Sequence, residues 1–220
     1  MSSRTVHMYI FDTLADWEPG FAIAGLNNPD LQMGPEPYRV RTVGQTSSPV
    51  RSIGGVTMVP DLELDALSPA DSAMLILPGG EVWDAGGNEE AAEKAGEFLN
   101  AGVPVAAICG ATAGLARAGL LDTRRHTSNA PEYLVATGYA GAALYEDRAV
   151  VADRGLITAS AMAALDFARA IFVTLDVYPP DVLEAWYGLF STRRPEYFEA
   201  LMRAAAAQSA GQEAGSPESS

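Results

Sequence analysis

The chain has little cysteine, histidine or positive charge. Its 220 residues include one cysteine and two histidines, and 28 acidic side chains against 14 basic ones give a net charge of −14. A single cysteine excludes an internal disulfide and fits a reducing cytoplasm, where we expect the protein to act. Because so few cysteines and histidines make a poor zinc site, we expect no metal and no other cofactor. The negative charge repels nucleic acid and anionic membrane, so we expect neither as a partner.

Long uninterrupted apolar runs are also missing. The uncharged run from 98 to 116 approaches the length that spans a bilayer, but Gly102, Pro104, Gly110 and Gly114 interrupt it. The N-terminus, MSSRTVHMYIFD, has no cationic segment followed by a long apolar core, as a signal peptide would have. With 48% hydrophobic residues and no repeat, the chain is expected to form one globular domain.

Short apolar runs alternate with helical patterns along the chain. Strands are predicted near 5–12, 38–44, 71–80 and 103–109, with a hairpin at 50–61 and two short strands within 149–160. Helices are predicted from about residue 16 or 18, at 88–100, from 109 to about 117, at 161–177, and twice after residue 179. This alternation predicts an α/β sandwich with a mostly parallel sheet over residues 1–178, a helical extension at 179–207 and a flexible tail at 208–220.

The predicted strand ends carry the residues of chemical interest. In open parallel sheets, ligands bind beyond the carboxyl ends of the strands. Three such ends stand out: Glu18 follows the first strand in ADWE, Gly79 and Gly80 end LILPGG, and Cys109 ends VPVAAIC.

Cys109 has the surroundings of a nucleophile on a tight strand-to-helix turn. Such a turn needs small residues two positions before and after the nucleophile, and Ala107 and Ala111 meet that need. A helix N-terminus favours the thiolate, which predicts a lowered pKa for the thiol. The N–H of Gly110 and one N–H of the Gly79-Gly80 turn would stabilise an oxyanion. The alternative is that Cys109 is a small buried hydrophobe.

Three residues are candidate partners of the thiol. His7 lies within the first strand, where a packed histidine is expected, whereas His126 lies in the polar segment LLDTRRHTSN, which can fold over the strand ends. His126 is therefore either a functional base or an exposed loop residue. Glu18 is either a surface residue that complements the helix dipole or a desolvated acid with a raised pKa that shares a proton with Cys109.

Several of these segments together resemble the ThiJ/PfpI family of the class I glutamine amidotransferase-like superfamily. The segments are ADWE, LILPGG and AAICGATAGLARAGLLDTRRHT, in that order, and the resemblance covers roughly residues 5–178. It implies a flavodoxin-like three-layer sandwich, a homodimer and a reactive cysteine. It also implies that Cys109 is the nucleophile, Glu18 the acid and His126 the downstream histidine, with Gly80 and Gly110 as oxyanion-hole amides and Gly79 shaping the turn.

Two departures from the family narrow the implied activity. Gly110 follows Cys109 where the protease-like members carry a histidine, and no histidine follows His126, whereas glutamine amidotransferases have a late His-x-Glu pair. A peptidase and a glutaminase are therefore less expected than a cysteine-dependent hydrolase or lyase that acts on a small carbonyl, amide or related electrophile. The alternatives are a redox sensor that records oxidation of Cys109, and a binding module without turnover.

Overall fold

The computed structural model describes residues 4–34 and 36–214, which are built around a seven-stranded sheet in the order β5-β2-β1-β6-β7-β9-β8. Its strands are β1 (Thr5–Tyr9), β2 (Arg39–Gly44), β5 (Leu62–Glu63), β6 (Met74–Leu77), β7 (Val105–Ile108), β8 (Val150–Asp153) and β9 (Leu156–Ala159). All neighbours are parallel except β8, which is antiparallel to β9. The mostly parallel α/β sheet is thus confirmed.

The middle of the sheet is covered on both faces. Every residue of β6, β7 and β9 is buried, as their nearly continuous apolar sequences predict for strands with helices on either side. The predicted hairpin forms separately: β3 (Val50–Arg51) pairs with β4 (Thr57–Met58), and Gly55 takes a φ of 82° in the turn. A positive φ is where glycine is preferred.

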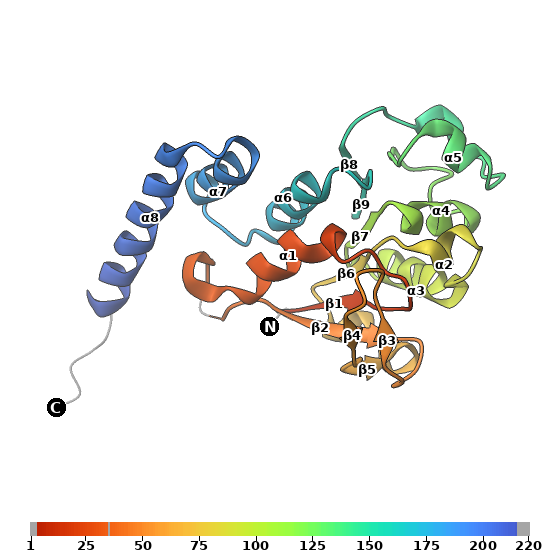
Figure 1. The fold of residues 1–220 in the computed structure, drawn as a ribbon, viewed down its shortest axis with the longest axis horizontal. Helices are drawn as coiled ribbons and strands as arrows, with labels where there is room; N and C mark the ends of the chain where they lie inside the picture. Colours follow the sequence, from red (N-terminus) through yellow and green to blue (C-terminus); the bar gives the residue numbers. More distant parts are fainter. Residues whose placement is uncertain (1–3, 35, 215–220) are drawn as a thin grey trace.

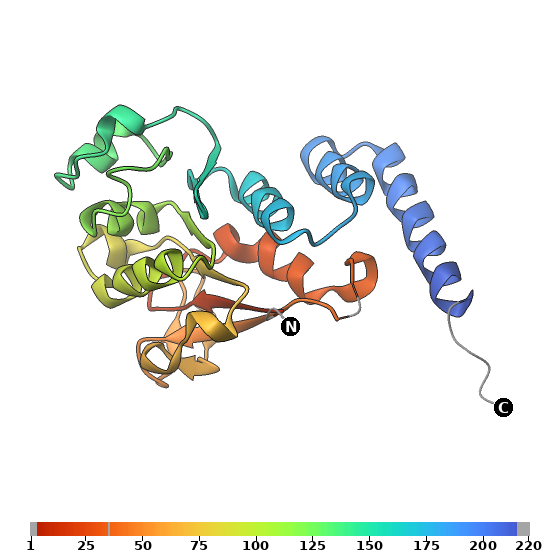
Figure 2. The same ribbon diagram turned by 180° about the vertical axis from the view of Figure 1, so that it is seen from behind.

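Helices form the two outer layers (Figures 1 and 2). They are α1 (Trp17–Asn27), α2 (Glu81–Asp84), α3 (Glu89–Asn100), α4 (Gly110–Arg117), α5 (Pro131–Val135), α6 (Ala164–Leu175), α7 (Pro180–Thr192) and α8 (Pro195–Ala214), with short 3-10 turns at Pro29–Leu31, Leu64–Ala66, Pro69–Asp71 and Ala142–Leu144. Helices α1 and α6 lie on one side of the sheet, and α3 and α4 lie on the other. This is the expected three-layer sandwich.

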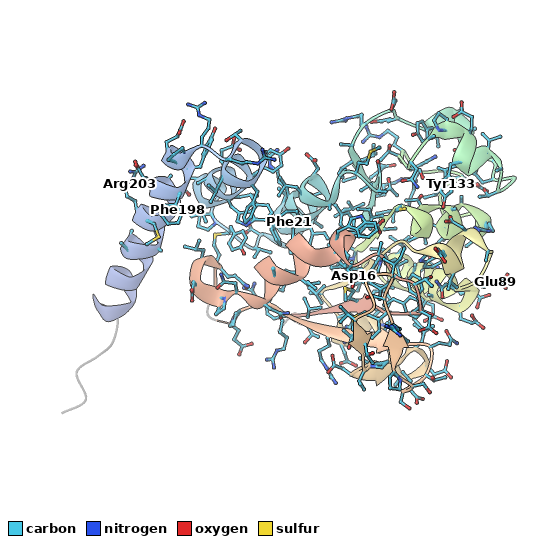
Figure 3. The ribbon with its side chains drawn as sticks, viewed as in Figure 1. Asp16, Phe21, Glu89, Tyr133, Phe198 and Arg203 are labelled. Atoms are coloured by element: carbon cyan, nitrogen blue, oxygen red, sulfur yellow. The ribbon has the colours of Figure 1, made fainter. Side chains whose placement is uncertain are left out.

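The C-terminal helices extend the layer of α1 and α6. The ring of Trp186 on α7 packs edge-on against Phe172 at 5.0 Å and Phe21 at 6.3 Å between ring centroids. Helix α8 then runs away from the sheet, with Phe198 and Arg203 along its length (Figure 3). It continues to Ala214, so residues 208–214 are helical where a flexible tail was expected, and residues 215–220 lie outside the described residues. Alanine, glutamine and glutamate favour a helix there.

No described helix combines the length and the apolar character needed to cross a bilayer.

Candidate active site

Cys109 lies between the end of β7 and the first residue of α4. Its backbone has φ 57° and ψ −124°, and a positive φ is uncommon for a residue with a side chain. The flanking alanines, Ala107 and Ala111, are completely buried, and the sulfur-bearing residue itself is half-buried. The predicted turn from strand to helix is therefore present.

Glycines allow the backbone to approach Cys109 closely. A Cβ added to Gly79 would lie 2.7 Å from the Cβ of Cys109 and 2.7 Å from Oε2 of Glu18. One added to Gly80 would lie 2.5 Å from the carbonyl oxygen of Thr13, and one added to Gly110 would lie 3.1 Å from the carbonyl oxygen of Gly80. Contacts below 3.0 Å do not occur without movement of the backbone or its neighbours, so Gly79 and Gly80 are required by packing.

Glu18 points into the site and not into solvent. Its side chain is only 1% exposed, its Oε2 accepts the N–H of Gly79 at 2.6 Å, and its carboxyl lies beside the side chain of Cys109, where its charge acts on the thiol. Helix α1 places it there because Glu18 is the second residue of the helix and faces the end of the sheet. Glu18 is therefore a desolvated acid and not a surface residue.

Glu18 and Cys109 control each other's proton. Burial raises the pKa of Glu18 to about 7. Burial, followed by the negative charge of Glu18, raises the pKa of the Cys109 thiol to about 12. The lowered thiol pKa expected at a helix N-terminus is therefore wrong, because desolvation and a neighbouring carboxylate outweigh the N–H groups of the helix. Glu18 is therefore about half-ionised near pH 7, whereas Cys109 keeps its proton throughout the neutral range.

Asn129 is a partner of the sulfur that the sequence did not indicate. Its Nδ2 donates to Sγ of Cys109 at 3.3 Å, and its Oδ1 accepts the N–H of Ala161 at 2.9 Å, which fixes the orientation of the amide. The neighbouring Ser128 holds this segment against α4 through Thr112, whose hydroxyl lies 2.6 Å from that of Ser128. Asparagine is common in loops, so only the tertiary contact distinguishes this one.

His126 is not brought to the thiol. It is completely buried, with Nδ1 2.8 Å from the carbonyl oxygen of Arg124 and Nε2 3.0 Å from the hydroxyl of Tyr139. Its ring also packs edge-on against Tyr139 and Tyr145. Because both ring nitrogens are engaged, the expected base beside Cys109 is not His126. His7 is buried as predicted, with Nδ1 2.6 Å from the hydroxyl of Ser72.

The carboxylate of Asp84 and the N–H of Gly110 also affect the pKa values of Glu18 and Cys109. The hydroxyl of Tyr133 on α5 (Figure 3) donates to the carboxylate of Asp84 on α2. The charge of Asp84 contributes to the raised pKa of Glu18, and the N–H of Gly110, next to Cys109 in the chain, favours the thiolate. The surroundings of the sulfur are thus a carboxyl, an amide NH2 and a backbone N–H.

Comparison with known proteins identifies the family of the chain. The sequence profile described as the DJ-1/PfpI family matches residues 4–174. The chain belongs to the DJ-1/PfpI family. A Bacillus subtilis protein named uncharacterized protease YoaZ is 40% identical over 205 residues, which is 92% of this chain and 98% of the relative.

Solved structures of the DJ-1/PfpI family share the fold. A ThiJ/PfpI family protein from Bacillus anthracis is 40% identical with a TM-score of 0.87, and covers 93% of this chain and 98% of its own. A DJ-1 superfamily protein from Agrobacterium tumefaciens is 31% identical with a TM-score of 0.77, over 86% and 98% of the two chains. A match over 93% of the chain extends past residue 174, so the DJ-1/PfpI relative shares at least part of the C-terminal helices.

The different positions of His126 and Asn129 lead to a first prediction. His126→Ala is expected to leave the pH dependence of Cys109 alkylation unchanged but to lower the free energy of unfolding by about 2–3 kcal/mol, since it opens a cavity and unpairs two buried groups. Asn129→Ala is expected to raise the pH at which Cys109 reacts, because the bond to the sulfur favours the thiolate. Iodoacetamide rates against pH and urea unfolding measure both effects. A shifted alkylation profile in His126→Ala would contradict this assignment.

Proposed function

We propose that the protein is a cysteine-dependent hydrolase or lyase whose Cys109 attacks the carbon of a small aldehyde, amide or related group, with Glu18 as the general base. The observation that carries the proposal is the buried Glu18 carboxyl beside the Cys109 thiol, which lies on a strained turn. A base with a pKa of about 7 is well matched to proton transfer at neutral pH.

The proposed reaction begins with the thiol protonated and Glu18 ionised. The sulfur forms a bond to the carbonyl carbon as its proton passes to the Glu18 carboxylate, and the carbonyl electron pair becomes an oxyanion. The N–H groups of Gly80 and Gly110 are the proposed donors to that oxyanion. With an aldehyde, Glu18 returns the proton to the oxygen and a hemithioacetal results. With an amide, the oxyanion collapses, Glu18 protonates the departing amine, and water hydrolyses the thioester.

A panel of substrates tests the proposal and identifies the kind of bond that the protein attacks. The panel contains methylglyoxal, simple amides and peptides, the last because the Bacillus subtilis relative is named a protease. We expect turnover of at least one class by the wild type and a loss of about a thousandfold or more in Cys109→Ala. His126→Gln is the matched control, because it changes neither Cys109 nor Glu18. Activity that survives in Cys109→Ala would remove the nucleophile from the proposal.

Oxidation of Cys109 is a second candidate function, favoured by the donors around the sulfur. Asn129 already donates a hydrogen bond to the sulfur and the N–H of Gly110 lies next to it, so both groups would stabilise oxygen atoms added to the sulfur. Hydrogen peroxide would oxidise the sulfur to a sulfenic acid with loss of water, and a second peroxide would give the sulfinic acid. Intact mass after graded peroxide measures this. Clean addition of two oxygens at Cys109 without turnover of any substrate would favour the sensor.

The expected small-molecule substrate, homodimer and cytoplasmic location accompany this proposal. A soluble small substrate suits a half-buried thiol at the end of a strand. Sedimentation of the purified chain measures whether it dimerises.

A further inference from the structure

A cavity of about 450 Å³ lies beyond the carboxyl ends of β1 and β2, and none of the groups that surround Cys109 lines it. Its polar lining includes Tyr9, Asp12, Gln45, Asn88 and Glu90. Crevices at this end of an open parallel sheet are where ligands commonly bind. The mechanism proposed for Cys109 uses none of these residues.

Asn88, which lines this cavity, has a left-handed backbone and an incompletely hydrogen-bonded side chain. It occupies the N-cap of α3 with φ 60° and ψ 30°, a left-handed conformation. An asparagine at an N-cap commonly accepts a backbone N–H of its helix, but this side chain makes no such bond. Its Oδ1 instead accepts the hydroxyl of Tyr9 at 3.2 Å, and its Nδ2 is buried with no hydrogen-bond partner among the described residues. A buried donor without an acceptor lowers the stability of the folded protein, so a bound molecule that supplies an acceptor would remove this cost.

A second carboxamide converges on the same phenol. Oε1 of Gln45 lies 3.4 Å from the hydroxyl of Tyr9. Burial, and then the charge of Glu90, raise the pKa of Tyr9 to about 12, so the phenol keeps its proton at neutral pH. One hydroxyl proton is shared by two carbonyl oxygens, which leaves the NH2 groups of Gln45 and Asn88 for an acceptor other than Tyr9.

The charges around the cavity restrict what that acceptor can be. Asp12 and Glu90 are the charged groups among the described lining residues, and no lysine or arginine is among them. One oxygen of Asp12 accepts the N–H of Arg51 at 2.8 Å. An anion would be repelled by the two carboxylates. A cation would satisfy them but would leave Nδ2 of Asn88 without an acceptor.

A hydroxyl group satisfies both requirements, because it accepts from the amide NH2 and donates to a carboxylate. We propose that this cavity binds a neutral, polyhydroxylated small molecule of about monosaccharide size, with Gln45 as a donor to its oxygens and Asp12 and Glu90 as acceptors. Asn88 would be a second donor, its side chain turning so that the buried Nδ2 faces the ligand. The site is separate from the thiol, so the proposal stands or falls independently of the chemistry at Cys109.

Saturation-transfer NMR on the full chain with D-glucose, D-ribose and myo-inositol tests the proposal. We expect binding of at least one of them, with an affinity about tenfold or more lower in Asn88→Gly. Glycine suits the left-handed backbone at this position, and the side chain removed does not cap α3, so the variant should keep its fold. Asn100→Ala, at the other end of α3, is the matched control and should bind as the wild type does. Cys109 alkylation should be the same in all three proteins.

Several outcomes would overturn the proposal. These are no signal from any of the three compounds, equal affinity in Asn88→Gly and wild type, or tighter binding of ribose 5-phosphate or putrescine than of the neutral sugars. If Asn88→Gly unfolds at a lower temperature than the wild type, Gln45→Ala is the second variant. Gln45 is exposed, so its loss removes one donor from the cavity without disturbing the core.

Discussion

Glu18→Gln is expected to make Cys109 more acidic and at the same time to slow turnover. The carboxylate raises the pKa of the thiol through its charge and by accepting the thiol proton, and the substitution removes both effects. Glutamine keeps a carbonyl oxygen for the N–H of Gly79, so the turn is retained. A like charge at this range shifts a pKa by roughly 1–3 units, so alkylation at pH 8 should accelerate about tenfold or more.

Turnover should change in the opposite direction because glutamine cannot accept the proton of the thiol. Loss of a general base lowers a rate by about 10²–10⁴-fold. In the wild type, kcat/KM should rise with pH through a midpoint of about 7, where Glu18 loses its proton and becomes able to act as a base. The two measurements are iodoacetamide rates and substrate turnover from pH 5 to 9, on wild type and Glu18→Gln. Alkylation that slows in Glu18→Gln would mean that the resting proton lies on Glu18 and the charge on sulfur.

Gly79→Ala is expected to separate Glu18 from Cys109. The new methyl group would lie 2.7 Å from the Cβ of Cys109, 2.7 Å from Oε2 of Glu18 and 2.9 Å from the backbone nitrogen of Gly110. Overpacking of this kind costs about 1–3 kcal/mol of stability. The displaced carboxyl can no longer receive the thiol proton, so turnover should fall about a hundredfold or more, as for other losses of a catalytic base.

Gly20→Ala is the matched control for this substitution. Gly20 lies two residues after Glu18 on the same helix, and a Cβ there would have no atom within 4 Å. Alanine in place of a helical glycine should raise the free energy of unfolding by about 0.5–1 kcal/mol and leave turnover unchanged. Urea unfolding and steady-state kinetics of both variants provide the comparison. Normal turnover in Gly79→Ala would show that the contact between Glu18 and Cys109 is not needed.

The C-terminal helices illustrate the limit of a local pattern. Their helical character could be read from VLEAWYGLF and PEYFEALMRAAAA, since helix propensity is local. The continuation of α8 to Ala214 was missed because serine and glycine interrupt the alanine-rich run there. Likewise, α2 (Glu81–Asp84) is only four residues long and has no period long enough to identify.

Most of the strands and helices, the turn at Cys109 and the close approach of Gly79, Gly80 and Gly110 followed from the sequence, whereas β5, α2 and α5 were not predicted. Buried parallel strands require apolar runs, and a tight turn from strand to helix requires small residues. Both features therefore produce local patterns that can be recognised in the sequence. The sequence also identified Glu18, Cys109 and His126 as candidates, but it did not show which of them lie together in the folded protein.

Only the tertiary structure decided which side chains meet at the sulfur. It brings Glu18 from α1 and Asn129 from the segment before α5 to Cys109, and it turns His126 toward Arg124 and Tyr139. It also decided the direction of the thiol pKa, because desolvation and the charge of Glu18 depend on what folds around the sulfur and not on its place at a helix N-terminus. Contacts between residues far apart in the chain depend on how several elements pack together, and no single stretch of sequence records that packing.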